Sequence, residues 1–287
     1  MLPRSILLAT DLDRRTDRAM DRAAALASEW KAPLVIAHAI EPGIPRGWPG
    51  AQPSDPRAAA TQRIREDLRE PVPADLSLVV ERGDAVKLVL ETITQRDCQL
   101  VVTGVARDTG FGRISAGATV DALARLSPVP VLTVKTRPNR PYRNVIVATD
   151  FSEPSRDALL TTLEMFPSAR IVLFHAVHVI YESLMDDKHA AREAEVRHAD
   201  ERAREFLAKT PVGDREIRIR SALGPPEHAL RELAAAGGVD LVVVGTRGRG
   251  MIGQLLLGSV ARSIVAGVPS DVLIASNRVM GQAPTAG

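Results

Sequence analysis

Short apolar runs alternate along this chain with longer segments in which apolar residues recur at helical spacing. Several of the runs are apolar throughout and rich in β-branched residues, which is typical of parallel strands buried on both faces. In the second half of the chain the pattern predicts strands at 144–149, 170–177, 215–222, 240–245 and 271–275. The segments between them predict helices at 154–165, 186–209, 226–236 and 257–266. Alternation of this kind indicates an α/β fold with a mostly parallel sheet.

The whole pattern occurs twice, with a period of about 140 residues. Residues 5–12 (SILLATDL) return as 144–151 (NVIVATDF), and 33–39 (PLVIAHA) return as 170–176 (RIVLFHA). Two later runs, LVVTG and PVPVL, return in the same order as LVVVG and PSDVL. Because the order of the landmarks is kept as well as their letters, each half is expected to fold as one domain.

We therefore expect two domains, residues 1–137 and 141–277, on either side of the Pro-rich polar segment 136–142. Right-handed helical crossovers between successive strands would make each domain a doubly wound, five-stranded sheet. In such sheets ligands bind at the carboxyl ends of the strands, where the strand order reverses. Ser152, followed by Glu153 and Pro154, has the sequence of a helix start just after the first strand of the second domain.

Composition narrows the function classes. Lys and Arg together number 37 and Asp and Glu 35, so the charge balance does not favour nucleic acid. The single cysteine, Cys98, excludes an internal disulfide and a cysteine-based zinc site, and we expect it to be a small buried apolar residue. We find no apolar stretch near the roughly 20 residues that a membrane helix requires. A cytoplasmic protein without a membrane partner is the expectation.

The strongest functional signal is a glycine-rich segment, 244–260 (VGTRGRGMIGQLLLGSV), between an apolar strand and an apolar helix. Glycines at 245 and 248 would let the backbone approach a ligand closely. Gly258 and Ser259 would then open the following helix with free N–H groups and the positive end of its dipole, which suits a phosphate. Its GRGMIG letters also spell the dinucleotide-binding fingerprint, but that fingerprint belongs after the first strand of a domain, not the fourth.

The spacing of Gly245, Gly248, Gly258 and Ser259 resembles the ATP-binding signature of the universal stress protein family, and the resemblance covers almost the whole chain as a tandem pair. It implies the adenine nucleotide alpha hydrolase-like fold, with the two repeats paired about a pseudo-twofold axis. It also implies contacts to the sugar and base from Ala148, Thr149, Asp150 and Ala176. The contacts it implies on the phosphate side are Val244, Gly245, Gly248, Gly258, Ser259 and Val260. Arg247 and Arg249 are either further contacts to the triphosphate or solvated loop residues.

The first repeat departs from this pattern. When Gly104 is aligned with Gly245, Gly117 matches Gly258, but Arg107, Asp108 and Ala118 replace Gly248, Arg249 and Ser259. An added side chain, an added carboxylate and a lost hydroxyl each disfavour a bound triphosphate. We expect a degenerate nucleotide site in the first domain, despite Thr10, Asp11 and Ala39, and an intact one in the second.

Other chemistry is weakly indicated. His175 and His178 lie near a strand end, and His189 and His198 lie nine residues apart on a predicted helix, so neither pair has the spacing of a metal site. The favoured function is an ATP-binding stress-response sensor or regulator, with Mg²⁺ as an optional companion of the nucleotide. The alternatives are a slow ATP-hydrolysing enzyme and a nucleotide-independent interaction scaffold. A second copy of the chain and a regulatory protein are the expected further partners.

Overall fold

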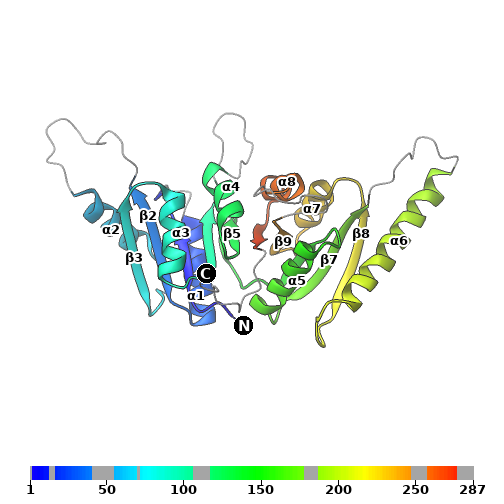
Figure 1. Ribbon diagram of the computed structural model, residues 1–287, viewed down its shortest axis with the longest axis horizontal. Helices are drawn as coiled ribbons and strands as arrows, with labels where there is room; N and C mark the ends of the chain where they lie inside the picture. The colour runs from blue at the N-terminus through cyan, green and yellow to red at the C-terminus, as the bar shows by residue number, and fades with distance from the viewer. Residues whose placement is uncertain are drawn as a thin grey trace, which may run out of the picture. The chain divides into compact units, whose positions relative to one another are not determined.

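The structure is a computed structural model, and it describes residues 2–12, 17–40, 55–69, 72–105, 117–177, 187–246 and 257–276 (Figure 1). The chain divides into two compact units, Leu2–Pro141 and Tyr142–Gly287. Each unit is an α/β domain, as the duplicated sequence pattern predicts.

The first domain alternates strands with helices throughout the part that the structure describes. Its strands are β1 (Ile6–Ala9), β2 (Leu34–Ile40), β3 (Leu76–Arg82), β4 (Leu100–Gly104) and β5 (Val131–Val134). Its helices are α1 (Asp17–Trp30), α2 (Pro56–Asp67), α3 (Ala85–Gln95) and α4 (Gly117–Leu126).

The second domain repeats this order of elements. Its strands are β6 (Asn144–Ala148), β7 (Arg170–Val177), β8 (Ile217–Leu223), β9 (Leu241–Gly245) and β10 (Asp271–Ala275). Its helices are α5 (Glu153–Met165), α6 (Lys188–Ala208), α7 (Pro226–Ala235) and α8 (Ser259–Gly267). The strands and helices predicted from the sequence of this half are therefore all confirmed, with ends that differ by at most two residues.

Both sheets are parallel between all of the strand pairs that the structure describes within each domain. The strand order is β3-β2-β1-β4-β5 in the first domain and β10-β9-β6-β7-β8 in the second. In each case the first strand lies in the middle, with the second and fourth strands as its neighbours. The order therefore reverses between the first and fourth strands, which for the second domain means between β6 and β9.

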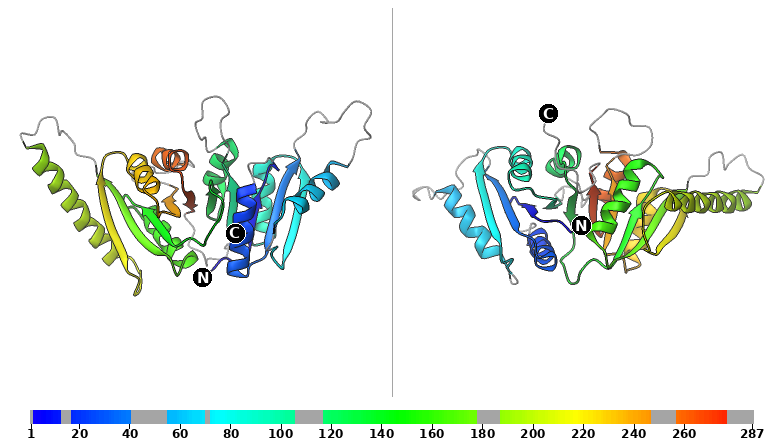
Figure 2. Two further views of the ribbon diagram at one scale, coloured as in Figure 1. Left: turned by 180° about the vertical axis from the view of Figure 1, so that it is seen from behind. Right: turned by 60° about the horizontal axis from the view of Figure 1, so that its bottom comes forward.

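Helices cover both faces of the second sheet (Figures 1 and 2). On one face α5 packs against β6, β9 and β10, and α6 packs against β7 and β8. On the other face α7 and α8 pack against each other, with α7 over β7 and β8 and α8 over β10. Leu241, Val242 and Val243 are fully buried because both faces are covered, which explains why the strand sequence is apolar without alternation.

In both domains, the residue before the fourth strand holds the start of the first strand. The Asp240 carboxylate accepts hydrogen bonds from the backbone N–H groups of Arg143 (2.9 Å) and Asn144 (2.8 Å). In the first domain the Gln99 side-chain oxygen accepts one from the backbone N–H of Arg4 (2.9 Å). The two repeats therefore make the same connection with different side chains. No helix in the described ranges is long and apolar enough to cross a membrane.

Candidate functional site

The carboxyl ends of β6 and β9 lie side by side where the strand order reverses. Val147 of β6 is in register with Val243 of β9. The residues that follow each strand, Thr149 and Asp150 on one side and the Gly245–Thr246 segment on the other, consequently leave the sheet at the same edge. This is the position at which open α/β sheets bind ligands.

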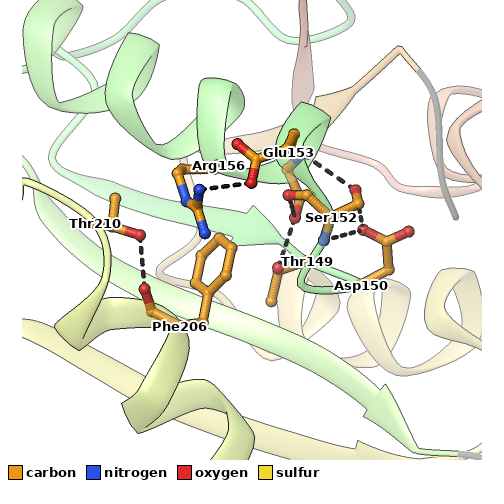
Figure 3. Close-up of polar contacts among 8 residues, drawn as sticks. Thr149, Asp150, Ser152, Glu153, Arg156, Phe206 and Thr210 are labelled. Atoms are coloured by element: carbon orange, nitrogen blue, oxygen red, sulfur yellow. Dashed lines mark hydrogen bonds and ion pairs between the residues drawn. The ribbon is translucent and has the colours of Figure 1, made fainter.

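Hydroxyl and carboxylate groups organise the turn between β6 and α5 (Figure 3). The Thr149 hydroxyl accepts a hydrogen bond from the backbone N–H of Phe151 (2.9 Å) and lies 2.9 Å from the Ser155 hydroxyl. One carboxylate oxygen of Asp150, Oδ1, accepts hydrogen bonds from both the backbone N–H (3.1 Å) and the hydroxyl of Ser152. Asp150, which is half-buried, is therefore held in one orientation at the edge of the sheet.

Ser152 is the N-cap of α5, as the sequence predicts. Its hydroxyl accepts a hydrogen bond from the backbone N–H of Ser155 (3.4 Å), and Pro154 occupies the first turn, where a missing N–H leaves no bond unmade. The sequence did not indicate the second role of Ser152, its contact with Asp150. The spacing Asp-x-Ser after a strand is the signal from which such a turn could have been predicted.

Phe151 adopts a left-handed backbone conformation, with φ of +63°. A non-glycine residue at this φ costs free energy that surrounding contacts must offset. The Phe151 ring lies 4.4 Å from the His175 ring and 5.7 Å from the Phe206 ring of α6, measured between centroids. The guanidinium of Arg202 lies over the same ring, 4.7 Å from its centroid. Helix α6 thereby packs directly against the turn that carries Asp150.

The first domain builds the same turn with an aliphatic side chain. Leu12, at the position of Phe151, has φ of +57°, and its backbone N–H donates to the Thr10 hydroxyl (3.0 Å). In both domains a histidine of the second strand lies within hydrogen-bond distance of the threonine carbonyl oxygen. The Nδ1 to oxygen distances are 2.9 Å for His38 and 2.8 Å for His175. His175 is thus part of the fold shared by the two domains.

Gly245 has a structural reason to be glycine in addition to the one that the sequence suggests. A β-carbon at this position would lie 2.8 Å from the carbonyl oxygen of Pro154, at the start of α5. The missing side chain therefore allows α5 to pack against the end of β9, and close approach of a ligand to Gly245 stays a prediction. This close packing still helps the site indirectly, because it fixes the Asp150 turn next to β9.

Helix α8 begins beside this edge, and its N-cap residue is a glycine, which has no side chain to cap the first N–H groups. Gly258 is the N-cap, its own N–H donates to the Thr246 carbonyl (3.2 Å), and its carbonyl accepts the N–H of Arg262 (3.0 Å). Ser259 and Val260 form the exposed first turn, and the Val260 side chain is 50% exposed, which is high for an apolar residue. Such a helix start carries partial positive charge and free donors.

The end of β7 completes the site predicted from the sequence. Ala176 pairs with Ala222 of β8 and is half-buried, while Val244 is buried within β9. Just beyond β8, Gly224 has φ of +98° and its N–H donates to the carbonyl of Val177 (2.9 Å). The GPPE sequence at 224–227 is therefore a left-handed turn that leads into α7.

Several residues of the predicted sites lie outside the described residues: Gly248, Arg247 and Arg249 in the second domain, Arg107 and Asp108 in the first, and His178. Of the first-domain residues that align with the α8 start, Gly117 is the first residue of α4, with φ of +74°, and Ala118 is exposed. The contrast between the two repeats at the phosphate side thus remains a prediction from sequence.

The remaining histidines of the predicted set lie on the helix surface. His189 pairs with Glu193 and His198 with Glu201, both as exposed neighbours along α6. In the portion of the chain that the structure describes, His, Cys, Asp and Glu side chains form no group of three able to hold a metal ion. Cys98 is buried in the first domain, 3.6 Å from the Ser5 hydroxyl, as expected of a small apolar residue.

Close to the Asp150 turn, one carboxyl group has a shifted pKa. Burial raises the pKa of Asp157 above its ordinary value, and the negative charge of Glu153 raises it further, while Arg156 opposes the shift. Arg156 itself forms an ion pair with Glu153 (2.6 Å) and lies over the Phe206 ring of α6. The charged residues on this side of α5 therefore join it to α6.

Comparison with known proteins adds evidence independent of the site. The model of the Universal stress protein family matches this chain twice, at residues 3–135 and 141–276. A universal stress protein of Mycolicibacterium smegmatis is 24% identical over 292 residues, which cover 95% of this chain and 97% of that protein.

Solved structures agree on the fold over the same length. A protein of Pseudomonas aeruginosa PAO1, described as functionally unknown, has a TM-score of 0.66 at 20% identity and covers 96% of this chain and 92% of that one. A universal stress protein of Archaeoglobus fulgidus has a TM-score of 0.62 at 17% identity, covering 96% of this chain and 97% of that one. At these identities the likeness establishes a shared tandem architecture.

Proposed function

This chain belongs to the universal stress protein family, and from that membership we propose that its second domain binds ATP as a stress-response sensor or regulator. The observation that carries the proposal is the meeting of two features at the reversal point of the second sheet. One is the Asp150 carboxylate, held at the end of β6 by Ser152. The other is the start of α8, where Ser259 and Val260 are exposed and the N-cap residue, Gly258, provides no side-chain cap.

The charges of these two features assign an orientation to the nucleotide. A triphosphate is attracted by the positive end of the α8 dipole and by its free N–H donors. It is repelled by the Asp150 carboxylate, which instead accepts hydrogen bonds from neutral hydroxyl groups. We therefore place the phosphates toward α8, the ribose toward Asp150 and the adenine toward the backbone of Ala176. A magnesium ion would arrive with the phosphates.

A binding role fits the Asp150 geometry better than a catalytic one. Both hydrogen bonds from Ser152 end on the same carboxylate oxygen, so Asp150 is arranged as an oriented acceptor. A regulatory protein or a second copy of the chain would then recognise the ATP-bound form of this protein in the cytoplasm. Sensitive phosphate-release assays test the enzymatic alternative, because turnover above about one per second, an ordinary enzyme value, would identify an ATPase.

Equilibrium titration of the full chain with ATP tests the proposal. We expect one tight site per chain, located in the second domain. An exchange of aligned residues between the repeats locates it: Gly248→Arg should abolish binding, whereas Arg107→Gly should leave it intact. The reverse result, with binding lost in Arg107→Gly and kept in Gly248→Arg, would refute the assignment. A Gly248→Arg variant that lost ATP yet kept its cellular task would instead support the interaction scaffold.

A further inference from the structure

Asp150 and Ser152 are joined in a way that orients the carboxylate. The backbone N–H and the hydroxyl of Ser152 both donate to Oδ1 of Asp150. Figure 3 shows the two side chains together at the turn, with the other carboxylate oxygen directed away from α5. Two donors on one oxygen restrict rotation of the carboxylate, so they also determine the direction of Oδ2.

The Ser152 hydroxyl bonds more strongly to the Asp150 carboxylate than to the backbone of α5. It donates its one proton to the Asp150 carboxylate, whereas the helix-capping bond that it accepts from the Ser155 N–H is 3.4 Å long. Hydrogen bonds weaken as they lengthen, and those to a charged acceptor are the stronger class. The hydroxyl group is therefore positioned chiefly to hold the carboxylate.

An oriented carboxylate selects ligands by their hydroxyl groups. It can only accept hydrogen bonds, and the neutral donors of an adenine nucleotide are the ribose 2′- and 3′-hydroxyls and the amino group of the base; in the orientation proposed above, the ribose hydroxyls are the donors that face Asp150. A site whose buried polar group must receive a hydroxyl discriminates strongly against an analogue that lacks it. The strength of this discrimination depends on the carboxylate pointing in the correct direction.

We propose that Ser152 is a positioning residue that directs the Asp150 carboxylate at the ribose hydroxyls and so makes the second domain selective for ribonucleotides over deoxyribonucleotides. This inference rests on the proposed function, because it concerns the same nucleotide. In the first domain Asp13 stands at the aligned position, so the serine hydroxyl belongs to the second repeat alone.

The test compares dissociation constants for ATP, 2′-deoxy-ATP and 3′-deoxy-ATP on the full chain. The wild type should prefer ATP over at least one deoxy analogue by about tenfold or more, the usual effect of one hydrogen bond to a charged group. Ser152→Gly removes the hydroxyl but keeps a residue that is tolerated at helix N-caps, so folding should be retained. It should reduce the preference to within about threefold, and Ser152→Thr should restore it.

Ser155→Ala is the matched control. It removes a hydroxyl from the same turn that lies next to Thr149 and donates to the backbone carbonyl of Ser152 (2.9 Å) but leaves the Ser152 hydroxyl and its bond to Asp150 in place, so the ribose preference should stay at the wild-type value. Circular dichroism verifies that every variant is folded.

The outcomes separate this inference from the proposed function. If the wild type binds ATP and both deoxy analogues equally, the inference is wrong while ATP binding stands. If Ser152→Gly weakens all three nucleotides by the same factor, or none of them, Ser152 acts only as a helix cap and the inference is again wrong. If no adenine nucleotide binds to the wild type, both proposals fall.

Discussion

The backbone of Pro154 lies so close to Gly245 that a β-carbon on the glycine would be 2.8 Å from the proline carbonyl oxygen. Gly245 ends β9 and Pro154 lies in the first turn of α5, so this approach joins two segments that are far apart in the sequence. It explains why the fourth strand of the second domain ends in glycine, and it fixes the position of the Asp150 turn at the edge of the sheet.

Replacement of Gly245 by alanine should therefore destabilise the second domain. Because the obstructing atom belongs to the backbone, the clash is relieved only by moving α5, and we expect a loss of about 1–3 kcal/mol in the free energy of unfolding. Chemical denaturation measures the loss. Gly267→Ala is the control, since its β-carbon would meet the flexible end of Arg231 at 3.2 Å and the Glu227 β-carbon at an ordinary contact distance of 3.8 Å, so stability should change little. Equal stability of the Gly245→Ala variant and the wild type would contradict the packing argument.

Asp157 should make the protein less stable as the pH rises. Burial and the charge of Glu153 raise the pKa of Asp157 in the folded state. Between the ordinary aspartate pKa and this raised pKa, the folded protein therefore binds more protons than the unfolded chain. The destabilising contribution of Asp157 to the free energy of unfolding is absent below the ordinary aspartate pKa. It grows as the pH rises toward the raised pKa and is constant above that value. Asp157→Asn should thus raise the melting temperature at pH 7 and leave it nearly unchanged near pH 3.

Glu195→Gln, an exposed change on α6, serves as the control and should shift the melting temperature little at either pH. A melting temperature for Asp157→Asn that did not exceed the wild-type value at pH 7 would disagree with the burial of this carboxylate.

An acidic residue at the start of α8 should change helix stability and ATP affinity in opposite directions. Ser259→Asp places a negative charge at the positive end of the helix dipole, which stabilises a helix by about 0.3–1 kcal/mol. The same charge would repel a triphosphate, so ATP affinity should fall by tenfold or more while the melting temperature holds or rises. Calorimetry and thermal melts measure the two quantities.

Ala118→Asp is the matched change at the aligned position of the first domain, where the residue is also exposed. It should leave ATP affinity at the wild-type value. If it lowered the affinity as much as Ser259→Asp does, the nucleotide would not belong to the second domain.

Phe151→Leu places in the second domain the residue that the first domain uses. Leu12 shows that leucine is compatible with the left-handed backbone, so the variant should fold. The loss of ring contacts with His175 and Phe206, and of the Arg202 guanidinium above the ring, should lower the free energy of unfolding by about 1–2 kcal/mol. Hydrogen exchange should speed up in the C-terminal part of α6. An unchanged exchange rate in that part of the helix would show that the contacts of the Phe151 ring do not stabilise α6.

Cys98 should react slowly with thiol reagents in the native protein. It is buried, and burial raises the pKa of its thiol, so the reactive thiolate is scarce as well as inaccessible. Labelling at pH 8 should therefore follow opening of the first domain and accelerate sharply in denaturant. Labelling at the rate of a free thiol without denaturant would show that this core opens readily.

The elements could be predicted from sequence because their signals are local. The strand from Leu241 to Gly245 is apolar throughout and bounded by polar residues, and Ser152 with Pro154 marks a helix start on its own. The duplication strengthened each assignment, since two similar segments support the same interpretation. The helix ends predicted at 186 and 236 differ by two residues and one residue from the observed ends, Lys188 and Ala235, because helices end where local propensities are weak.

The parts of the site that the sequence did not indicate depend on contacts between distant segments. The closeness of Gly245 to Pro154 arises only when β9 lies beside β6, and the contact between the Phe206 and Phe151 rings only when α6 packs on the sheet. Ser152 was recognised as a cap from its neighbours, but its bond to Asp150 requires the particular turn that follows β6.

The hydrogen bond between Asp240 and the backbone of Asn144 has a consequence for folding during synthesis. These residues are 96 positions apart in the sequence. Strand β6 can therefore pair with its neighbour β9 only after β9 has been synthesised. At ribosomal rates of about 5–20 residues per second, β6 would wait several seconds with one edge unpaired. The first domain has the same strand order and the same long-range connection, from Arg4 to Gln99, so each nascent domain passes through a stage with an unpaired strand edge, at which aggregation and chaperone binding are expected.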